Sequence, residues 1–198
     1  MRSKSILITA VFCALFITAF GLNTSWGDVI DQRWEIPHSS YDWGTYSIKN
    51  GYPLGQEFTA GRNNITGVEL YMRLYNPPRE IATVDVTIRD DTIQGSILAS
   101  GTSAFDADGW SYFDFGGAVP LSVGHRYVIE ASMLTGSEFW GWHSWNDADG
   151  IGVPGRLIRE GQFVDPGYAF GFRTYAVPEP ATLLLFGLSA VILRKRKK

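Results

Sequence analysis

The sequence predicts an all-β fold, an antiparallel β-sandwich of jelly-roll-like type with about eight or nine strands. Two observations predict this class. Short segments in which apolar and polar residues alternate recur every ~10–15 residues, and Gly, Pro, Asn and Asp separate them. Between the two ends of the chain, no segment has the apolar spacing of an amphipathic helix.

The N-terminus is typical of a secretory signal peptide. Two positive charges precede an apolar stretch over residues 6–22, and Ser25-Trp26-Gly27 supplies small residues for cleavage. A second possible cleavage site is Ala19-Phe20-Gly21. We therefore expect residues 1–27 to be removed during export.

The mature domain, residues 28–176, is expected to be acidic and free of cysteine. Without the two ends of the chain, 10 Lys and Arg stand against 19 Asp and Glu, a net charge of −9. Such a charge argues against nucleic acids and anionic membranes as partners and leaves carboxylates available for cations. The single cysteine, Cys13, lies in the signal segment. Disulfides, thiolate catalysis and cysteine-ligated zinc are therefore excluded from the mature domain.

Strand predictions are strongest in the middle of the domain. In residues 65–75 and 83–89, strict alternation of apolar and polar side chains predicts strands with one buried face. Weaker patterns predict further strands at residues 29–36, 55–59, 96–100, 110–115, 126–132, 138–145, 156–160 and 168–175. The residues between the first and second of these weaker strands are expected to form a loop.

The densest aromatic stretch, residues 139–145, is a candidate binding site. As a strand it places Trp140 and Trp142 on one face, with Trp145 at its end. Flat aromatic rings can stack on the apolar face of a sugar, so these three tryptophans predict a carbohydrate-binding surface. The alternative is that Trp140 and Trp142 are core residues, which the frequency of large aromatic side chains in β cores favours.

Two Asp-rich segments are candidate calcium sites. Asp147 and Asp149 occupy alternate positions before Gly150, and residues 106–109 form a partial copy. Calcium takes six to eight oxygen ligands, which this spacing can begin to supply, but the glutamate that completes an EF-hand loop is missing. Asp-Gly is also ordinary turn chemistry. Calcium is therefore possible, and no other cofactor is expected.

Catalytic motifs are not apparent in the sequence. It contains no Gly-x-Ser-x-Gly elbow, phosphate-binding loop or dinucleotide-binding Gly motif, and its three histidines are not at metal-ligand spacing. We expect no enzyme. A glycan-acting hydrolase is kept as a further alternative, because its two carboxylates would meet only in the fold.

The C-terminus has three parts: Pro178-Glu179-Pro180, an uncharged apolar run over residues 181–193, and five cations at 194–198. The prolines interrupt regular structure. As a helix the run would span roughly 20 Å, short of the ~30 Å hydrocarbon core, and snorkelling cations and local thinning can close that gap. We expect a short transmembrane helix with the cations in the cytoplasm. A core helix is the alternative.

This tail, residues 177–198, resembles the PEP-CTERM sorting signal of Gram-negative bacteria in the order and spacing of its three parts. The resemblance implies recognition of Pro178, Glu179 and Pro180 by a membrane-embedded exosortase and processing near that motif. It also implies export through the inner membrane, membrane attachment before processing, and a final place in the envelope, at the cell surface or in extracellular polymer.

Residues 54–175 resemble the choice-of-anchor β-sandwich domains of bacterial surface proteins. The phrases that carry the resemblance include Leu54-Gly-Gln-Glu-Phe-Thr59, Leu121-Ser-Val-Gly-His-Arg-Tyr127 and Ala169-Phe-Gly-Phe-Arg-Thr-Tyr175. It implies a sandwich joined to an anchor and assigns no catalytic residue. The predicted function is an exported, non-catalytic envelope or matrix protein. The first alternative is a carbohydrate-binding module for extracellular polysaccharide.

Overall fold

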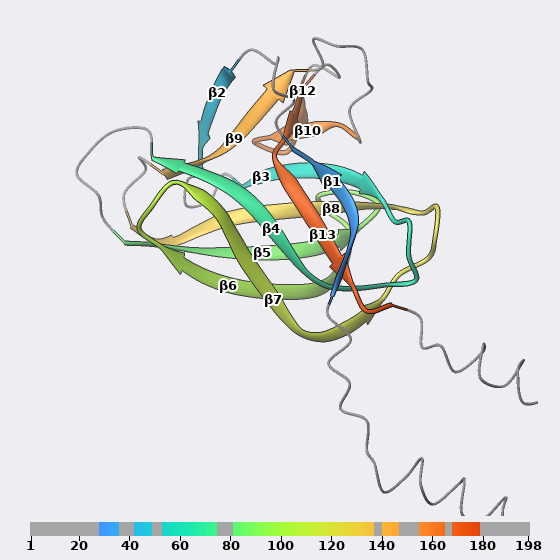
Figure 1. Ribbon diagram of the computed structural model, residues 1–198. Coiled ribbons are helices and arrows are strands. Elements are labelled where there is room, and N and C mark those ends of the chain that lie inside the picture. Colours follow the sequence, from blue (N-terminus) through green and yellow to red (C-terminus); the bar gives the residue numbers. More distant parts are fainter. Residues whose placement is uncertain are drawn as a thin grey trace, which may run out of the picture.

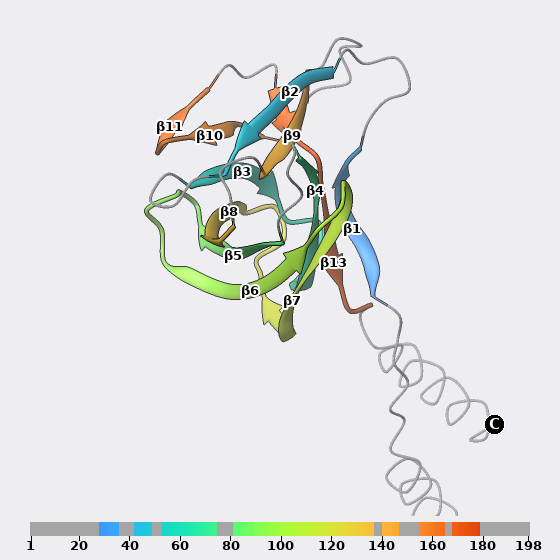
Figure 2. The same ribbon diagram turned by 90° about the vertical axis from the view of Figure 1, so that its left-hand side faces the viewer.

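The chain forms two antiparallel β-sheets that pack face to face (Figures 1 and 2). The computed structural model describes residues 28–35, 42–48, 53–74, 81–136, 140–146, 155–164 and 168–178, which contain thirteen strands and no helix. These two sheets confirm the all-β, antiparallel prediction. The expected signal peptide and the expected tail helix lie outside the described residues. Within those residues, no helix is long and apolar enough to cross a membrane.

The seven-stranded sheet is built around β4 (Asn64–Leu74). On one side β4 pairs with β7 (Gly109–Pro120), and on the other with β13 (Phe172–Ala176) and β9 (Trp140–Asn146). β1 (Val29–Trp34) pairs with β13, while β2 (Asp42–Ser47) and β12 (Tyr168–Phe170) pair with β9.

The six-stranded sheet is continuous from edge to edge. Its order is β11 (Gln162–Phe163), β10 (Leu157–Arg159), β3 (Leu54–Thr59), β8 (Arg126–Thr135), β5 (Ala82–Asp90) and β6 (Ile97–Phe105). The chain changes sheet at every step between described strands except from β1 to β2, β5 to β6, β10 to β11 and β12 to β13. Most strands that are consecutive in sequence therefore lie in different sheets.

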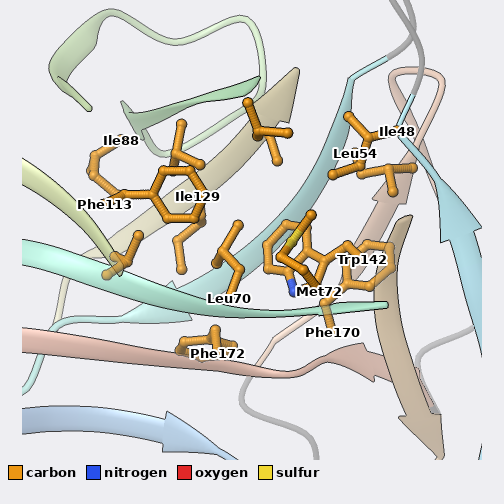
Figure 3. Close-up of a cluster of buried hydrophobic side chains, with 14 of the residues drawn as sticks. Ile48, Leu54, Leu70, Met72, Ile88, Phe113, Ile129, Trp142, Phe170 and Phe172 are labelled. Atoms are coloured by element: carbon orange, nitrogen blue, oxygen red, sulfur yellow. The ribbon is translucent and has the colours of Figure 1, made fainter. Parts of the chain in front are cut away.

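Alternation predicted the core correctly. On β4, Val68, Leu70 and Met72 have no exposed surface. They are the alternate apolar residues that the pattern over residues 65–75 predicted to be buried. Figure 3 shows Leu70 and Met72 facing Leu54, Ile88 and Ile129 of the opposite sheet. Burying each of these large side chains contributes about 1.5–3 kcal/mol, so this interface is the main source of stability.

The strand β2 and the division at Gly171 were not predicted. β2 lies in the segment that was expected to be a loop. Its pairing with β9 is irregular between Asp42 and Gly44, and Gly44 has φ +130°, a bulge that disrupts the period-two pattern. The predicted strand at 168–175 is divided at Gly171 into β12 and β13. There the chain leaves β9 and joins β4.

Candidate functional site

Trp140 and Trp142 are core residues with no exposed surface. The Trp140 ring packs edge-on against Phe105 at 4.9 Å, and the Trp142 ring stacks on Phe170 at 4.4 Å. The indole N–H of Trp142 donates a hydrogen bond to the Gly171 carbonyl at 2.8 Å. A buried ring cannot stack on a sugar in solvent. The predicted surface platform is therefore wrong for these two residues, and the core alternative holds.

The remaining predicted ligand residues are not placed by the structure. Trp145 belongs to β9, where its backbone pairs with Ala169, but its side chain lies outside the described residues. Asp147 and Asp149 also lie outside them, so calcium there stays a prediction. Of the described residues, no three His, Cys, Asp or Glu side chains converge to hold a metal ion.

The outer surface of the seven-stranded sheet carries an unexpected group of side chains, which we call the aromatic face: Glu69, Tyr71, Trp110, Tyr112, Arg173 and Tyr175. Strand register brings them together. Glu69 on β4 lies opposite Tyr112 on β7 and Arg173 on β13, and Tyr71 lies opposite Trp110. Such cross-strand neighbours have Cβ atoms about 5 Å apart, which sets up direct contact.

Arg173 is the centre of the aromatic face. Its Nε donates to Glu35 Oε1 at 2.6 Å, and its Nη1 donates to Glu69 Oε2 at 2.8 Å. The guanidinium lies 4.0 Å from the centre of the Trp110 ring, a cation–π contact. Two carboxylates and one aromatic ring thereby fix the position of the Arg173 guanidinium.

Two phenols complete the aromatic face. The Tyr175 hydroxyl donates to Glu69 Oε2 at 2.6 Å, and burial, followed by this hydrogen bond, raises the pKa of Tyr175 to about 12. Burial, followed by the charges of Asp28 and Asp114, also raises the pKa of Tyr112. Both hydroxyls therefore remain protonated donors at any physiological pH. Tyr112 is 39% exposed and packs edge-on against Tyr175 at 5.5 Å.

The sequence contained a signal for the aromatic face. Within residues 65–75, alternation puts Tyr71 on the polar side of the strand. Within residues 110–115, it puts Trp110 and Tyr112 opposite the core residue Phe113. Aromatic side chains on the outward side of a strand point to a surface site, whereas a dense aromatic run indicates a core as readily.

The outer surface of the six-stranded sheet contains a pocket of about 420 Å³, lined by Pro53, Arg89, Ile93, Gln94, Glu130, Glu160 and Gly161. An ion pair lies in its wall. The Arg89 Nε and Nη2 donate to Glu130 at 2.7 and 3.1 Å, and Nη1 donates to the Gly95 carbonyl at 3.0 Å. Only 9% of the Glu130 side chain is exposed. The pocket therefore offers polar groups that are already paired with one another.

The tail matches a known family. Residues 176–197 match the model of the PEP-CTERM protein-sorting motif, and this match includes Pro178, Glu179 and Pro180. No curated protein matched the chain. The motif identifies a signal for exosortase processing and indicates an exported protein associated with the cell envelope of a Gram-negative bacterium. The sorting motif of exosortase-processed proteins thus begins at Ala176, the last residue of β13.

Proposed function

We propose that this chain is an envelope or extracellular-matrix protein whose non-catalytic, jelly-roll-like sandwich is delivered by the exosortase system. One observation carries the proposal. Ala176 is the last residue of β13 and also the first residue of the matched sorting motif. The chain therefore joins a folded unit directly to a sorting signal. The pairing of Arg173 with Glu35 and Glu69, and of Arg89 with Glu130, supports a structural or binding role.

The proposal is tested by replacing Pro178, Glu179 and Pro180 with alanine. The variant is expected to accumulate as an unprocessed precursor in the inner-membrane fraction, because the exosortase no longer recognises it. Immunoblots of cell fractions and intact mass of the purified protein measure both effects. The matched control is Asp108→Asn, in an exposed turn. If the triple variant is processed and distributed like this control, the sorting proposal is wrong.

A second candidate function, carbohydrate binding, is favoured by the aromatic face. Half-buried Trp110 and exposed Tyr112 lie beside the Arg173–Glu69 ion pair, and aromatic rings next to polar groups are the combination that stacks a sugar ring. The candidate site thereby moves from the buried tryptophans to the outer surface of the seven-stranded sheet.

A glycan array probed with the exported protein tests this second candidate. Trp110→Ala is expected to weaken glycan binding about five- to tenfold, since stacking on an aromatic ring contributes about 1–1.5 kcal/mol. Gln94→Ala, in the pocket of the other sheet, should bind normally. If only Gln94→Ala loses glycan binding, the site lies in the pocket. If no glycan on the array binds, carbohydrate binding is no longer a candidate function. Loss on calcium chelation would implicate Asp147 and Asp149, and release of reducing sugar would indicate a hydrolase.

A further inference from the structure

A side chain holds the chain at Val177, immediately before the Pro178-Glu179-Pro180 segment of the sorting motif. The side-chain amide of Asn64 binds both backbone groups of Val177. The Val177 N–H donates to Asn64 Oδ1 at 2.9 Å, and Asn64 Nδ2 donates to the Val177 carbonyl at 3.2 Å. A side-chain amide that donates to and accepts from the backbone of one residue replaces the two backbone hydrogen bonds that a residue on a neighbouring strand would make.

The backbone of β4 does not provide this partner. β13 pairs with β4 as far as Tyr175, which lies opposite Gly67. Beyond that point β4 is irregular between Ile65 and Gly67 in its pairing with β7. Ala176 still pairs with Val29 of β1. Through its side chain, Asn64 therefore extends the hydrogen bonding of β13 one residue beyond Ala176, up to Pro178.

The next residue ends this ladder. Pro178 has no N–H group and cannot donate to a neighbouring strand. A second contact fixes Asn64, whose Nδ2 also donates to Asn63 Oδ1 at 2.8 Å. The hydrogen-bonded ladder of β13 thus ends at Val177, held by the Asn64 side chain and followed by a proline.

We propose that Asn64 is a positioning residue for exosortase processing, because it holds Val177 in the sheet and away from the protease. A protease needs its substrate in an extended form separated from other strands, so residues up to 177 become available only when the Asn64 contact opens. Processing is thereby restricted to Pro178 and the residues after it, and the mature protein keeps Val177. This inference rests on the proposed function.

The experiment compares wild type, Asn64→Ala, Asn64→Asp and Thr102→Ala. The last is the matched control, because it removes one exposed side-chain hydrogen bond on the other sheet. Amide exchange at Val177 is measured on the full-length precursor, purified from cells that lack exosortase. Loss of two hydrogen bonds should speed exchange roughly tenfold in Asn64→Ala. Asn64→Asp keeps only the acceptor oxygen, so its exchange rate at Val177 should lie between those of wild type and Asn64→Ala.

Processing is then followed in cells by pulse-chase, and the C-terminus of the product is determined by intact mass. Asn64→Ala should be processed several-fold faster than wild type and should yield additional products that end before Val177. Thr102→Ala should behave as wild type. If amide exchange at Val177 is faster in Asn64→Ala but its processing rate and the C-termini of its products are unchanged, the inference is overturned. The proposed function then remains intact. If wild type itself is not processed, the proposed function fails, and the inference fails with it.

Discussion

Replacing Trp142 with alanine is expected to lower the free energy of unfolding by about 3–5 kcal/mol, the usual range for a fully buried large aromatic residue. The change removes the ring that stacks on Phe170 and leaves the Gly171 carbonyl without its indole donor. This effect is a large fraction of the stability of a typical domain. Chemical denaturation followed by circular dichroism measures it.

Two further variants define the cause. Trp142→Phe keeps an aromatic ring in the core and loses the hydrogen bond to Gly171, so its cost should be smaller, about 1–3 kcal/mol. Trp110→Ala, on the aromatic face, should cost less than Trp142→Ala because Trp110 is only partly buried. Equal costs for the two alanine variants would contradict the assignment of Trp142 to the core.

Replacing Arg89 with methionine is expected to cost about 3 kcal/mol of unfolding free energy. The Glu130 carboxylate is buried and would lose both of its hydrogen bonds from Arg89. An unpaired buried charge typically costs 3–5 kcal/mol, and the low end applies because 20% of the Arg89 side chain is exposed. Denaturation at neutral pH measures the effect.

A double variant separates a lost ion pair from lost packing. Arg89→Met combined with Glu130→Leu removes both charges, so most of the stability should return. Arg159→Met is the matched control, because Arg159 is an exposed arginine whose ion pair with Glu160 is 3.5 Å long. It should cost less than about 1 kcal/mol. A double variant that is no more stable than Arg89→Met would show that packing, not charge, is responsible.

The fold was predictable where one face of a strand is buried and the other is exposed to solvent. β4 and β5 show this, because their alternate residues are apolar and lie in the core. β2 could not be predicted, since its bulge at Gly44 breaks the alternation. The extension of β6 to Phe105 was also missed, because Ser and Gly at residues 100–103 resemble a turn.

The candidate site was less predictable than the fold. β9 is buried on both faces, with His143 on the side opposite Trp142 having 2% exposure, so its aromatic density reflects the core. Composition alone does not reveal that the second face of β9 is also buried. The network around Arg173 depends on pairing between strands that are distant in sequence, which alternation within one strand does not specify. The sorting motif was predictable because its parts are contiguous in the chain.

The position of β13 determines when this protein can fold. The strand lies between β1 and β4, so the first strand of the domain has its pairing partner at the very end of the domain. When the N-terminal part of the chain emerges first during translocation, β1 and one side of β4 remain open strand edges. They stay open until residue 176 has emerged. Pairing over such a long sequence separation is slow, and open edges promote aggregation. Chaperone protection during translocation is therefore most important in the interval before the residues that adjoin the sorting motif emerge.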